Sequence, residues 1–394
     1  MVYVLLSIML LGWLGGVLLF SLPLTQRRRG TLPPATPEPD SGGAGTGGAR
    51  GVSVIVPARN EANRIGELLR ALAAQTVSPL EIIVMDDEST DDTAAVAERL
   101  GARVVHTPPR PERWMGKPWA CQCGADEAAG DTLLFLDADV SLAPDAFAKL
   151  LAARKRSMAV VSVQPHHRVQ RPYETLSALF NAQVVASVGL GPTTRGLYGP
   201  CIMMTVDEYR RCGGHAAVRA SVVDDVALGR ACRDAHLRLC TYLGGRTIHF
   251  RMYPEGFRQM LSGWVKNFLH GAAATARPML FAQSMWIVGA ATVAVQAAFA
   301  VARLPIGIVP LSVALGAYAA YAALLALSLP RYGQFGPGTA LLFPVHIIFF
   351  VCVTACALWV RVRRGSVNWR GRQVTPHGDP VSARAADGSR SDEA

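Results

Sequence analysis

The sequence lacks several motifs that would assign it to a common class of protein. Its 8 cysteines include no pair of CxxC motifs at zinc-ligand spacing, so a zinc site is not expected, and Cys121 and Cys123 are expected to be small buried thiols. No G-x-x-x-x-G-K-[ST] loop and no G-x-G-x-x-G turn follows the first predicted strand, which disfavours a P-loop NTPase and a dinucleotide-dependent enzyme. Zinc-finger spacing and basic–aromatic patterns are also absent, so nucleic acid is not an expected partner.

Charged residues are scarce, at 17% of the 394 residues, and long stretches contain almost none. Residues 2–24 form a nearly uncharged segment that is long enough to span a bilayer. Three further candidate spans lie towards the C-terminus, at 281–302, 304–329 and 340–360. These segments contain no acidic residue, and ion-coupled transport typically needs ionisable groups inside the membrane, which argues against a transporter.

Positive charge follows the first apolar segment and does not precede it. The run of arginines at 27–29 therefore predicts an uncleaved anchor, not a cleaved signal peptide. By the positive-inside rule the following domain faces the cytoplasm, in a multi-pass protein of a bacterial-type plasma membrane. Three later crossings would leave the basic tail outside, so either one segment is re-entrant or interfacial or the charge rule fails here; we favour a cytoplasmic tail. The net charge of +10 then reflects basic flanks that meet anionic lipid.

Composition divides the chain into six parts. They are a membrane anchor, a flexible linker rich in Pro, Gly, Ala and Thr, an α/β domain, an interfacial helix region, a membrane region of two to three helices, and a basic, mostly disordered tail. Their predicted boundaries are 1–24, 25–50, 51–255, 256–278, 279–360 and 361–394.

The central domain alternates short apolar runs with helical periodicity. Strands are predicted at 52–56, in "EIIVMDDEST", in "ARVVHT" and at 132–136, with helices between them, the last at 119–129. This alternation predicts a parallel sheet covered on both faces, whose ligands bind beyond the carboxyl ends of the strands. Polar clusters fall at three of these ends, at 57–59, 86–87 and 137–139, so we expect them to line one crevice.

Two aspartates one residue apart, Asp137 and Asp139, end the strand in "LLFLDADV". A hard divalent cation, Mg²⁺ or Mn²⁺, would satisfy both carboxylates and bridge the oxygens of a diphosphate ligand. Lys117, in "MGKPWACQCG", can add a positive charge to the same phosphates. Two alternatives remain open: one aspartate caps a helix, and Lys117 is a solvated loop residue.

Five segments together resemble the family 2 glycosyltransferases of the Rossmann-like GT-A fold. They are "VSVIVPARNE", "VMDDESTDDT", "GKPWACQCG", "LLFLDADV" and "GGH…VVDDVALG", in the family's order over roughly 52–230. The resemblance implies an enzyme that binds a nucleotide-sugar through Pro57, Arg59, Glu61 and Asp87. It also implies that Asp137 contacts the ribose and that Asp137 and Asp139 hold a metal on the diphosphate.

The carboxylate pair Asp224–Asp225 has the position of the family's catalytic base, and the resemblance favours Asp225. A carboxylate there would remove the proton from a hydroxyl acceptor while direct displacement inverts the anomeric carbon. The alternative interpretation of this pair is the N-cap of the following helix. The family's processive members carry Gln-x-x-Arg-Trp, but this chain has "EGFRQMLSGWVKN", with Trp264 and Lys266 only, so polymer synthesis is not expected. Trp264 either closes the acceptor site or anchors at the membrane interface.

Further segments are similar to the subgroup that glucosylates carotenoid acids such as 4,4'-diaponeurosporenoate, and to its hopanoid-associated relatives. They are "SVQPHHRVQRPYETLSALFN", "FRMYPEGF", "RYGQFGPG" and "VNWRGRQV". The implied donor is UDP-glucose and the implied acceptor a long apolar lipid. His166, His167 and His249 lie in these segments, and structural hydrogen bonding is the favoured interpretation.

Two other functions remain open at this point. A polyprenyl-phosphate glycosyltransferase would need cationic groups for the acceptor phosphate, which Arg168, Arg171, Arg251 and Arg258 could supply. An inactive membrane scaffold is the other alternative, although the chain keeps every aspartate of the expected site.

Overall fold

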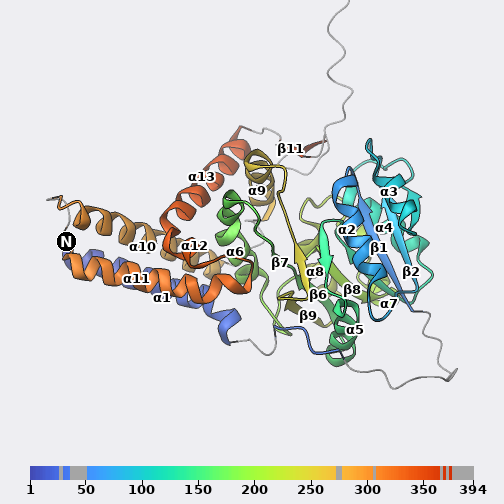
Figure 1. Ribbon diagram of the computed structural model, residues 1–394, viewed down its shortest axis with the longest axis horizontal. Helices are drawn as coiled ribbons and strands as arrows, with labels where there is room; N and C mark the ends of the chain where they lie inside the picture. The colour runs from blue at the N-terminus through green and yellow to red at the C-terminus, as the bar shows by residue number, and fades with distance from the viewer. Residues whose placement is uncertain are drawn as a thin grey trace, which may run out of the picture.

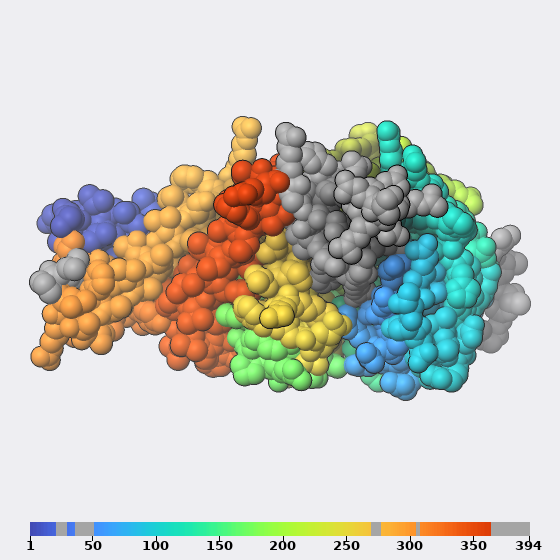
Figure 2. Space-filling model, turned by 90° about the horizontal axis from the view of Figure 1, so that it is seen from above, coloured from blue at the N-terminus to red at the C-terminus, as the bar shows by residue number. Residues whose placement is uncertain are grey.

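The computed structural model describes residues 1–25, 30–35, 51–271, 277–304, 308–363, 367–369 and 372–374. Figure 1 shows an α/β domain with a group of long helices packed against one side of it. In Figure 2, residues near 260 (yellow) lie between these long helices and the α/β domain. Most of the predicted linker 25–50 and of the predicted tail 361–394 lies outside the described residues.

The main sheet has seven strands in the order β3-β2-β1-β4-β8-β6-β9. Their bounds are β1 Val52–Ala58, β2 Glu81–Asp86, β3 Arg103–His106, β4 Thr132–Leu136, β6 Val160–Gln164, β8 Cys201–Thr205 and β9 Leu239–Leu243. All four strands predicted from the sequence form. These four strands run parallel, as expected, but the complete sheet is mixed, because β8, which the sequence did not predict, runs antiparallel to both β4 and β6. β8 is buried on both faces, and apolar composition reports burial without reporting direction.

Helices cover both faces of this sheet. One face carries α2 Ala62–Ala73, α3 Thr93–Arg99 and α5 Ala146–Ser157; the other carries α4 Gly116–Glu127, α7 Val206–Arg211 and α8 Asp224–Asp234. In α2, Ile65, Leu68, Leu69 and Leu72 are buried at the predicted helical spacing. α4 begins at Gly116 and not at the predicted residue 119, so Lys117 lies in a helical first turn, where a loop was one expectation. Cys121 and Cys123 on α4 are buried free thiols, as expected.

A small second sheet links the domain to the helices beyond it. It consists of β5 Val140–Leu142, β10 Ile248–Phe250 and β7 His166–His167. The chain continues from β7 into η1 Pro172–Ser177 and α6 Ala178–Val188. Elsewhere in the domain, η2 His215–Val218 precedes α8. Leu243 N donates to Gly30 O at 2.8 Å, and Thr31 forms an isolated parallel β-bridge with Leu243. This described piece of the predicted linker therefore pairs with the edge strand β9 of the main sheet.

Four helices among the described residues are long and apolar enough to cross a membrane. They are α1 Val2–Thr25, α10 Arg277–Val301, α11 Leu311–Ser328 and α13 Phe343–Val362. Shorter elements connect them to one another and to the domain: α9 Phe257–Gly271, η4 Leu329–Arg331, α12 Pro337–Leu341, β11 Val367–Trp369 and β12 Arg372–Val374. The predicted spans agree with these helices, except that α11 begins at Leu311, seven residues after the predicted start, and 308–310 is not helical. α1 and α10 lie side by side (Figure 1).

Polar contacts fasten the helices to the α/β domain. Arg251 Nη2, just after β10, lies 2.6 Å from Glu174 Oε1 on η1, and Glu174 is 1% exposed. His166 Nε2 is 3.1 Å from Pro330 O on η4, and His167 Nδ1 is 3.1 Å from Asn181 Nδ2 on α6. These two histidines make structural contacts, in line with the interpretation favoured from the sequence. The contacts fix the position of α6 and η4 relative to the sheet edge that carries the polar clusters.

Candidate active site

All nine residues predicted for the site line a single cavity of about 700 Å³. The cavity lies at the carboxyl ends of β1, β2 and β4 and extends towards α6, α9 and α10. The nine are Pro57, Arg59, Glu61, Asp87, Lys117, Asp137, Asp139, Asp224 and Asp225. The shared crevice expected from the strand ends is therefore present. It is also lined by residues of helices that the sequence analysis did not assign to the site.

The turn after β1 forms one end of the cavity. Arg59 Nη1 donates to the backbone oxygen of Asp87 at 2.7 Å and lies 3.2 Å from Glu88 Oε2. Asp87 N in turn donates to Ala58 O at 2.9 Å, so the segments after β1 and β2 are held together. Glu61 is buried, with Arg64 Nη1 3.3 Å from its carboxylate. This end presents a fixed backbone and paired charges, which suits recognition of a polar ligand such as a nucleoside.

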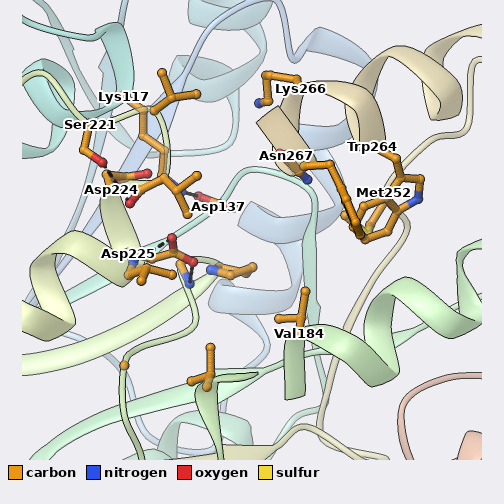
Figure 3. Close-up of a pocket in the computed structure, with 18 of the residues that line it drawn as sticks. Lys117, Asp137, Val184, Ser221, Asp224, Asp225, Met252, Trp264, Lys266 and Asn267 are labelled. Atoms are coloured by element: carbon orange, nitrogen blue, oxygen red, sulfur yellow. Dashed lines mark hydrogen bonds and ion pairs between the residues drawn. The ribbon is translucent and has the colours of Figure 1, made fainter. Parts of the chain in front are cut away.

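A lysine and three aspartates form the centre of the cavity. Lys117 Nζ lies 2.6 Å from Asp137 Oδ1 (Figure 3). Burial alone would lower the pKa of Lys117, but the negative charges of Asp137 and Asp224 outweigh burial and raise it. Lys117 is therefore a permanent cation between the aspartate of β4 and the aspartates of α8. An ammonium in that place can neutralise charge on a phosphate.

Asp225 is held by two backbone donors. Its Oδ2 accepts from Gly199 N at 2.9 Å, and its Oδ1 accepts from Val226 N at 2.8 Å. Burial, reinforced by the negative charge of Asp224, raises the pKa of Asp225 to about 6, although Lys117 opposes the shift. A carboxylate with a pKa near neutrality in a cavity is suited to accepting a proton.

The helix-cap interpretation of the Asp224–Asp225 pair does not describe α8. The N-cap residue of α8 is Val223, whose side chain makes no cap hydrogen bond, and both aspartates lie in the first turn. Asp224 is 9% exposed and lines the cavity beside Lys117 (Figure 3). Both carboxylates thus face the cavity.

Asp137 and Asp139 offer oxygen ligands for a divalent cation. Among the described residues, no group of three or more His, Cys, Asp or Glu side chains comes together to hold a metal ion by itself. Mg²⁺ is commonly bound by one or two carboxylates together with phosphate oxygens of a substrate. The two aspartates therefore fit a cation that arrives with, or is completed by, a diphosphate ligand.

The other end of the cavity is walled by helices and is largely apolar. Figure 3 shows Trp264, Lys266 and Asn267 of α9 and Met252 across the cavity from the aspartates, with Val184 of α6 below them. α10 contributes Leu280, Gln283, Ser284 and Ile287, and α13 contributes Phe350 and Thr354. Apart from Asn181 of α6, no sequence motif marked the lining residues of α6, α10 and α13, because they belong to largely apolar helices. Their position could be found only from the fold.

Trp264 is a wall of the cavity and is 2% exposed. Its Nε1 donates to Ser177 Oγ at 3.0 Å, and its ring stacks on Phe180 at 4.5 Å between centroids. A tryptophan so enclosed cannot reach the headgroups of a bilayer. Of the two roles expected for Trp264, the structure places the ring where it closes the cavity.

The arginines considered for an acceptor phosphate lie elsewhere. Arg168, Arg171, Arg251 and Arg258 are not among the described residues that line the cavity. Arg251 is engaged by Glu174, and Arg168 Nη1 lies 2.9 Å from Glu67 Oε1. Cations that do line it, and that the sequence did not suggest for it, are Arg110 and Arg195.

Comparison with known proteins gives close matches over most of the chain. Residues 53–210 match the family described as "Glycosyl transferase family 2". The chain is 32% identical over 338 residues to 4,4'-diaponeurosporenoate glycosyltransferase of Staphylococcus aureus (strain MRSA252), a match that covers 83% of this chain and 88% of that relative. The same enzyme from strain USA300 is 32% identical over 336 residues, with the same coverage.

A solved structure shares the fold over nearly its whole length. The mannosyltransferase PcManGT from Pyrobaculum calidifontis, in complex with GDP-Man and Mn²⁺, aligns with a TM-score of 0.53 and 20% identity. The alignment covers 89% of this chain and 99% of that chain. The α/β domain and the helices beyond it therefore form an arrangement already seen in a solved protein.

Proposed function

Because this chain belongs to glycosyl transferase family 2 and is therefore a glycosyltransferase, we propose that it moves a hexose onto a lipid held at the membrane. The proposed donor is UDP-glucose, and the proposed acceptor is a carotenoid acid or a hopanoid. The name of the Staphylococcus aureus relative gives diaponeurosporenoate as its acceptor, which supports this choice. The proposed location is the plasma membrane, with the α/β domain in the cytoplasm.

One observation carries this proposal: a single cavity joins the aspartates of the α/β domain to helices that are apolar enough to cross a membrane. Asp225 and Ile287 line the same space, although the first lies on α8 and the second on α10. A water-soluble acceptor would have no need of a wall made from such helices. A lipid could remain in the bilayer while its reactive end reaches Asp225.

The roles proposed for the residues follow from their places. Pro57, Arg59, Glu61 and Asp87 bind the nucleotide at the β1 end. With a hydroxyl acceptor, the oxygen attacks the anomeric carbon, its proton passes to Asp225, and the bond from that carbon to the diphosphate breaks. A carotenoid acid attacks through its carboxylate oxygen, which has no proton to lose, and the same bond to the diphosphate breaks. Lys117 stabilises the charge that develops on the leaving diphosphate. Attack from the side opposite to the leaving group inverts the configuration.

Asp137 and Asp139 would hold Mg²⁺ or Mn²⁺, and Asp137 would also contact the ribose. When bound, the cation supplies positive charge to the leaving diphosphate. The Mn²⁺ in the PcManGT complex supports use of a divalent cation in this fold.

The test is a transfer assay on membranes that contain the full chain. Radiolabelled UDP-glucose is added with Mg²⁺ or Mn²⁺, and label is counted in the organic extract for the wild type and for Asp139→Ala. The proposal expects lipid-bound label that falls at least tenfold in the variant and when EDTA removes the cation. Asp145→Ala, at an exposed aspartate beside α5, is the matched control and should keep wild-type transfer. Failure of UDP-glucose and of a panel of other nucleotide-sugars, with native lipids supplied, would overturn the proposal.

A further inference from the structure

The inner end of the cavity has features that the reaction at Asp225 does not use. There, α6, α10 and α13 enclose a passage lined by Val184, Gln283, Ile287 and Phe350. A narrow gap continues from this passage towards α1, because Gln283, Ile287 and Phe350 also line a second, much smaller space with Leu19 and Phe20. The passage therefore leads from the aspartates into the middle of the long helices.

The walls of the passage are apolar and firmly packed. Phe350 lies 4.8 Å from Phe180 and 5.2 Å from Phe268, measured between ring centroids. The hydroxyls nearby are satisfied within their own helices: Ser284 Oγ donates to Leu280 O at 3.0 Å, and Thr354 Oγ1 donates to Phe350 O at 2.8 Å. Such walls offer contact to hydrocarbon and little to a sugar or a phosphate.

Two polar atoms at the junction of the two spaces break this pattern. In the described part of the chain, Gln283 Oε1 and Trp286 Nε1 are buried without any hydrogen-bond partner. An unpaired polar group inside apolar surroundings destabilises the fold, so its presence calls for a partner that the chain itself does not supply. Gln283 lines both spaces, which places its amide beside whatever enters the passage.

We propose that this passage is the binding site for the hydrocarbon chain of the lipid acceptor and that Gln283 is a positioning residue whose amide hydrogen-bonds a polar group of that lipid. That the bound lipid is the acceptor rests on the proposed function. That the passage binds a lipid does not depend on it. Leu280 and Ser284 line the cavity and are exposed on the outer side of α10, so a chain can enter sideways from the bilayer. The helix α1 closes the far end, and Leu19 and Phe20 must move to admit a longer chain.

Two neighbouring residues of α10 provide a matched pair for the test. Ile287 lines the passage, whereas Val288 is 47% exposed on the outside of the same helix. Ile287→Trp fills the passage with a bulky apolar ring, and Val288→Trp adds the same ring where lipid already surrounds the helix. A C18 fatty acid with a terminal diazirine is the probe, and cross-linked peptides are mapped in the full-length protein in membranes.

The wild type and Val288→Trp are expected to cross-link to peptides of α1, α10 and α13, and Ile287→Trp to lose at least five-sixths of that labelling. Glucose transfer to lipid should fall in parallel in Ile287→Trp and should stay at the wild-type level in Val288→Trp. Equal labelling of both variants, or labelling confined to other helices, would overturn the inference. If neither the wild type nor any variant transfers glucose, but only Ile287→Trp loses the cross-linking, the proposed function is contradicted and the lipid-binding site is still supported.

Gln283→Leu separates binding from packing. A binding role predicts that the apparent KM for an organic extract of the host membranes rises about fivefold, with kcat unchanged and the melting temperature not lowered. A packing role predicts an unchanged KM and a higher melting temperature, because an unpaired amide has been removed. That second result would overturn the role given to Gln283.

Discussion

At the scale of single residues, Asp225 combines two properties that the sequence could not show together. It is fixed by the backbone donors of Gly199 and Val226, and burial together with the neighbouring carboxylate of Asp224 raises its pKa. A Cβ on Gly199 would lie 3.1 Å from Asp225 Oδ2, so a side chain there would press on the carboxylate and shift it.

Asp225→Asn should lower kcat by about 10²- to 10⁴-fold, because the amide cannot accept the proton of the acceptor hydroxyl. The KM for UDP-glucose should change little, since the nucleotide is bound at the other end. Initial rates of lipid glucosylation in membranes provide the measurement. Asp234→Asn, at the exposed end of the same helix, is the control, and equal activity of the two variants would contradict a catalytic role for Asp225.

The pH dependence of the reaction should report the same carboxylate. A base works only when deprotonated, so a pKa raised to about 6 predicts that kcat/KM rises up to tenfold per pH unit below 6 and levels off above it. The profile between pH 5 and 8 is measured with the wild type and with Asp225→Asn, which should lose the rise. A wild-type profile without this limb would mean that an already ionised acceptor, such as a carboxylate, attacks without help from Asp225.

At the scale of elements, the contact between α1 and α10 depends on glycine. A Cβ on Gly12 would lie 2.6 Å from Gly289 Cα and 2.5 Å from Tyr321 Oη. Tyr321 Oη also donates to Met9 O at 2.8 Å, which ties α11 to α1. The N-terminal helix is thus packed into the molecule, and membrane anchoring is not its whole role.

Gly12→Ala should destabilise the protein by about 1–3 kcal/mol, because α1 must move away from α10 to accept the methyl group. Gly316→Ala on α11 is the control, since nothing lies within 4 Å of a Cβ there and alanine favours a helix. Melting temperatures of both variants in the same detergent compare them. A Gly12→Ala protein as stable as the control would show that α1 and α10 do not pack so closely.

At the scale of the whole molecule, the last described helices bring the chain back to the α/β domain. α11 ends at the α/β domain, where Tyr332 O accepts from His167 N at 2.9 Å after η4. α13 then packs against α9, and β11, which follows it, lies beside α9 as well (Figure 1). The segment from η4 to β11 therefore leaves the domain and returns to it.

This arrangement predicts that the tail and the α/β domain lie on one side of the membrane. A C-terminal epitope tag and a cysteine introduced at Asp145 should both be inaccessible to antibody or maleimide in intact cells and accessible in inverted vesicles. A tag that is reached from outside while the Asp145→Cys thiol is protected would show that α13 crosses the membrane once.

The sequence by itself determined most helices and strands of the α/β domain and the edge of the sheet where the polar site residues lie. Polar clusters after β1, β2 and β4 had to meet, because the carboxyl ends of neighbouring parallel strands share one edge. Apolar segments near both ends of the chain were long enough to be read as spans. These are local or nearest-neighbour properties, which periodicity and strand order record directly.

Only the tertiary structure decided the direction of β8, the helical place of Lys117 and the second half of the cavity. A buried strand has the same composition in either direction, so β8 gave no sign of its reversal. Ile287 and Phe350 belong to helices that are apolar on every side, and such a pattern does not say which face meets lipid and which meets a ligand. That distinction arises from the packing of α6, α10 and α13 against the edge of a sheet far away in the sequence.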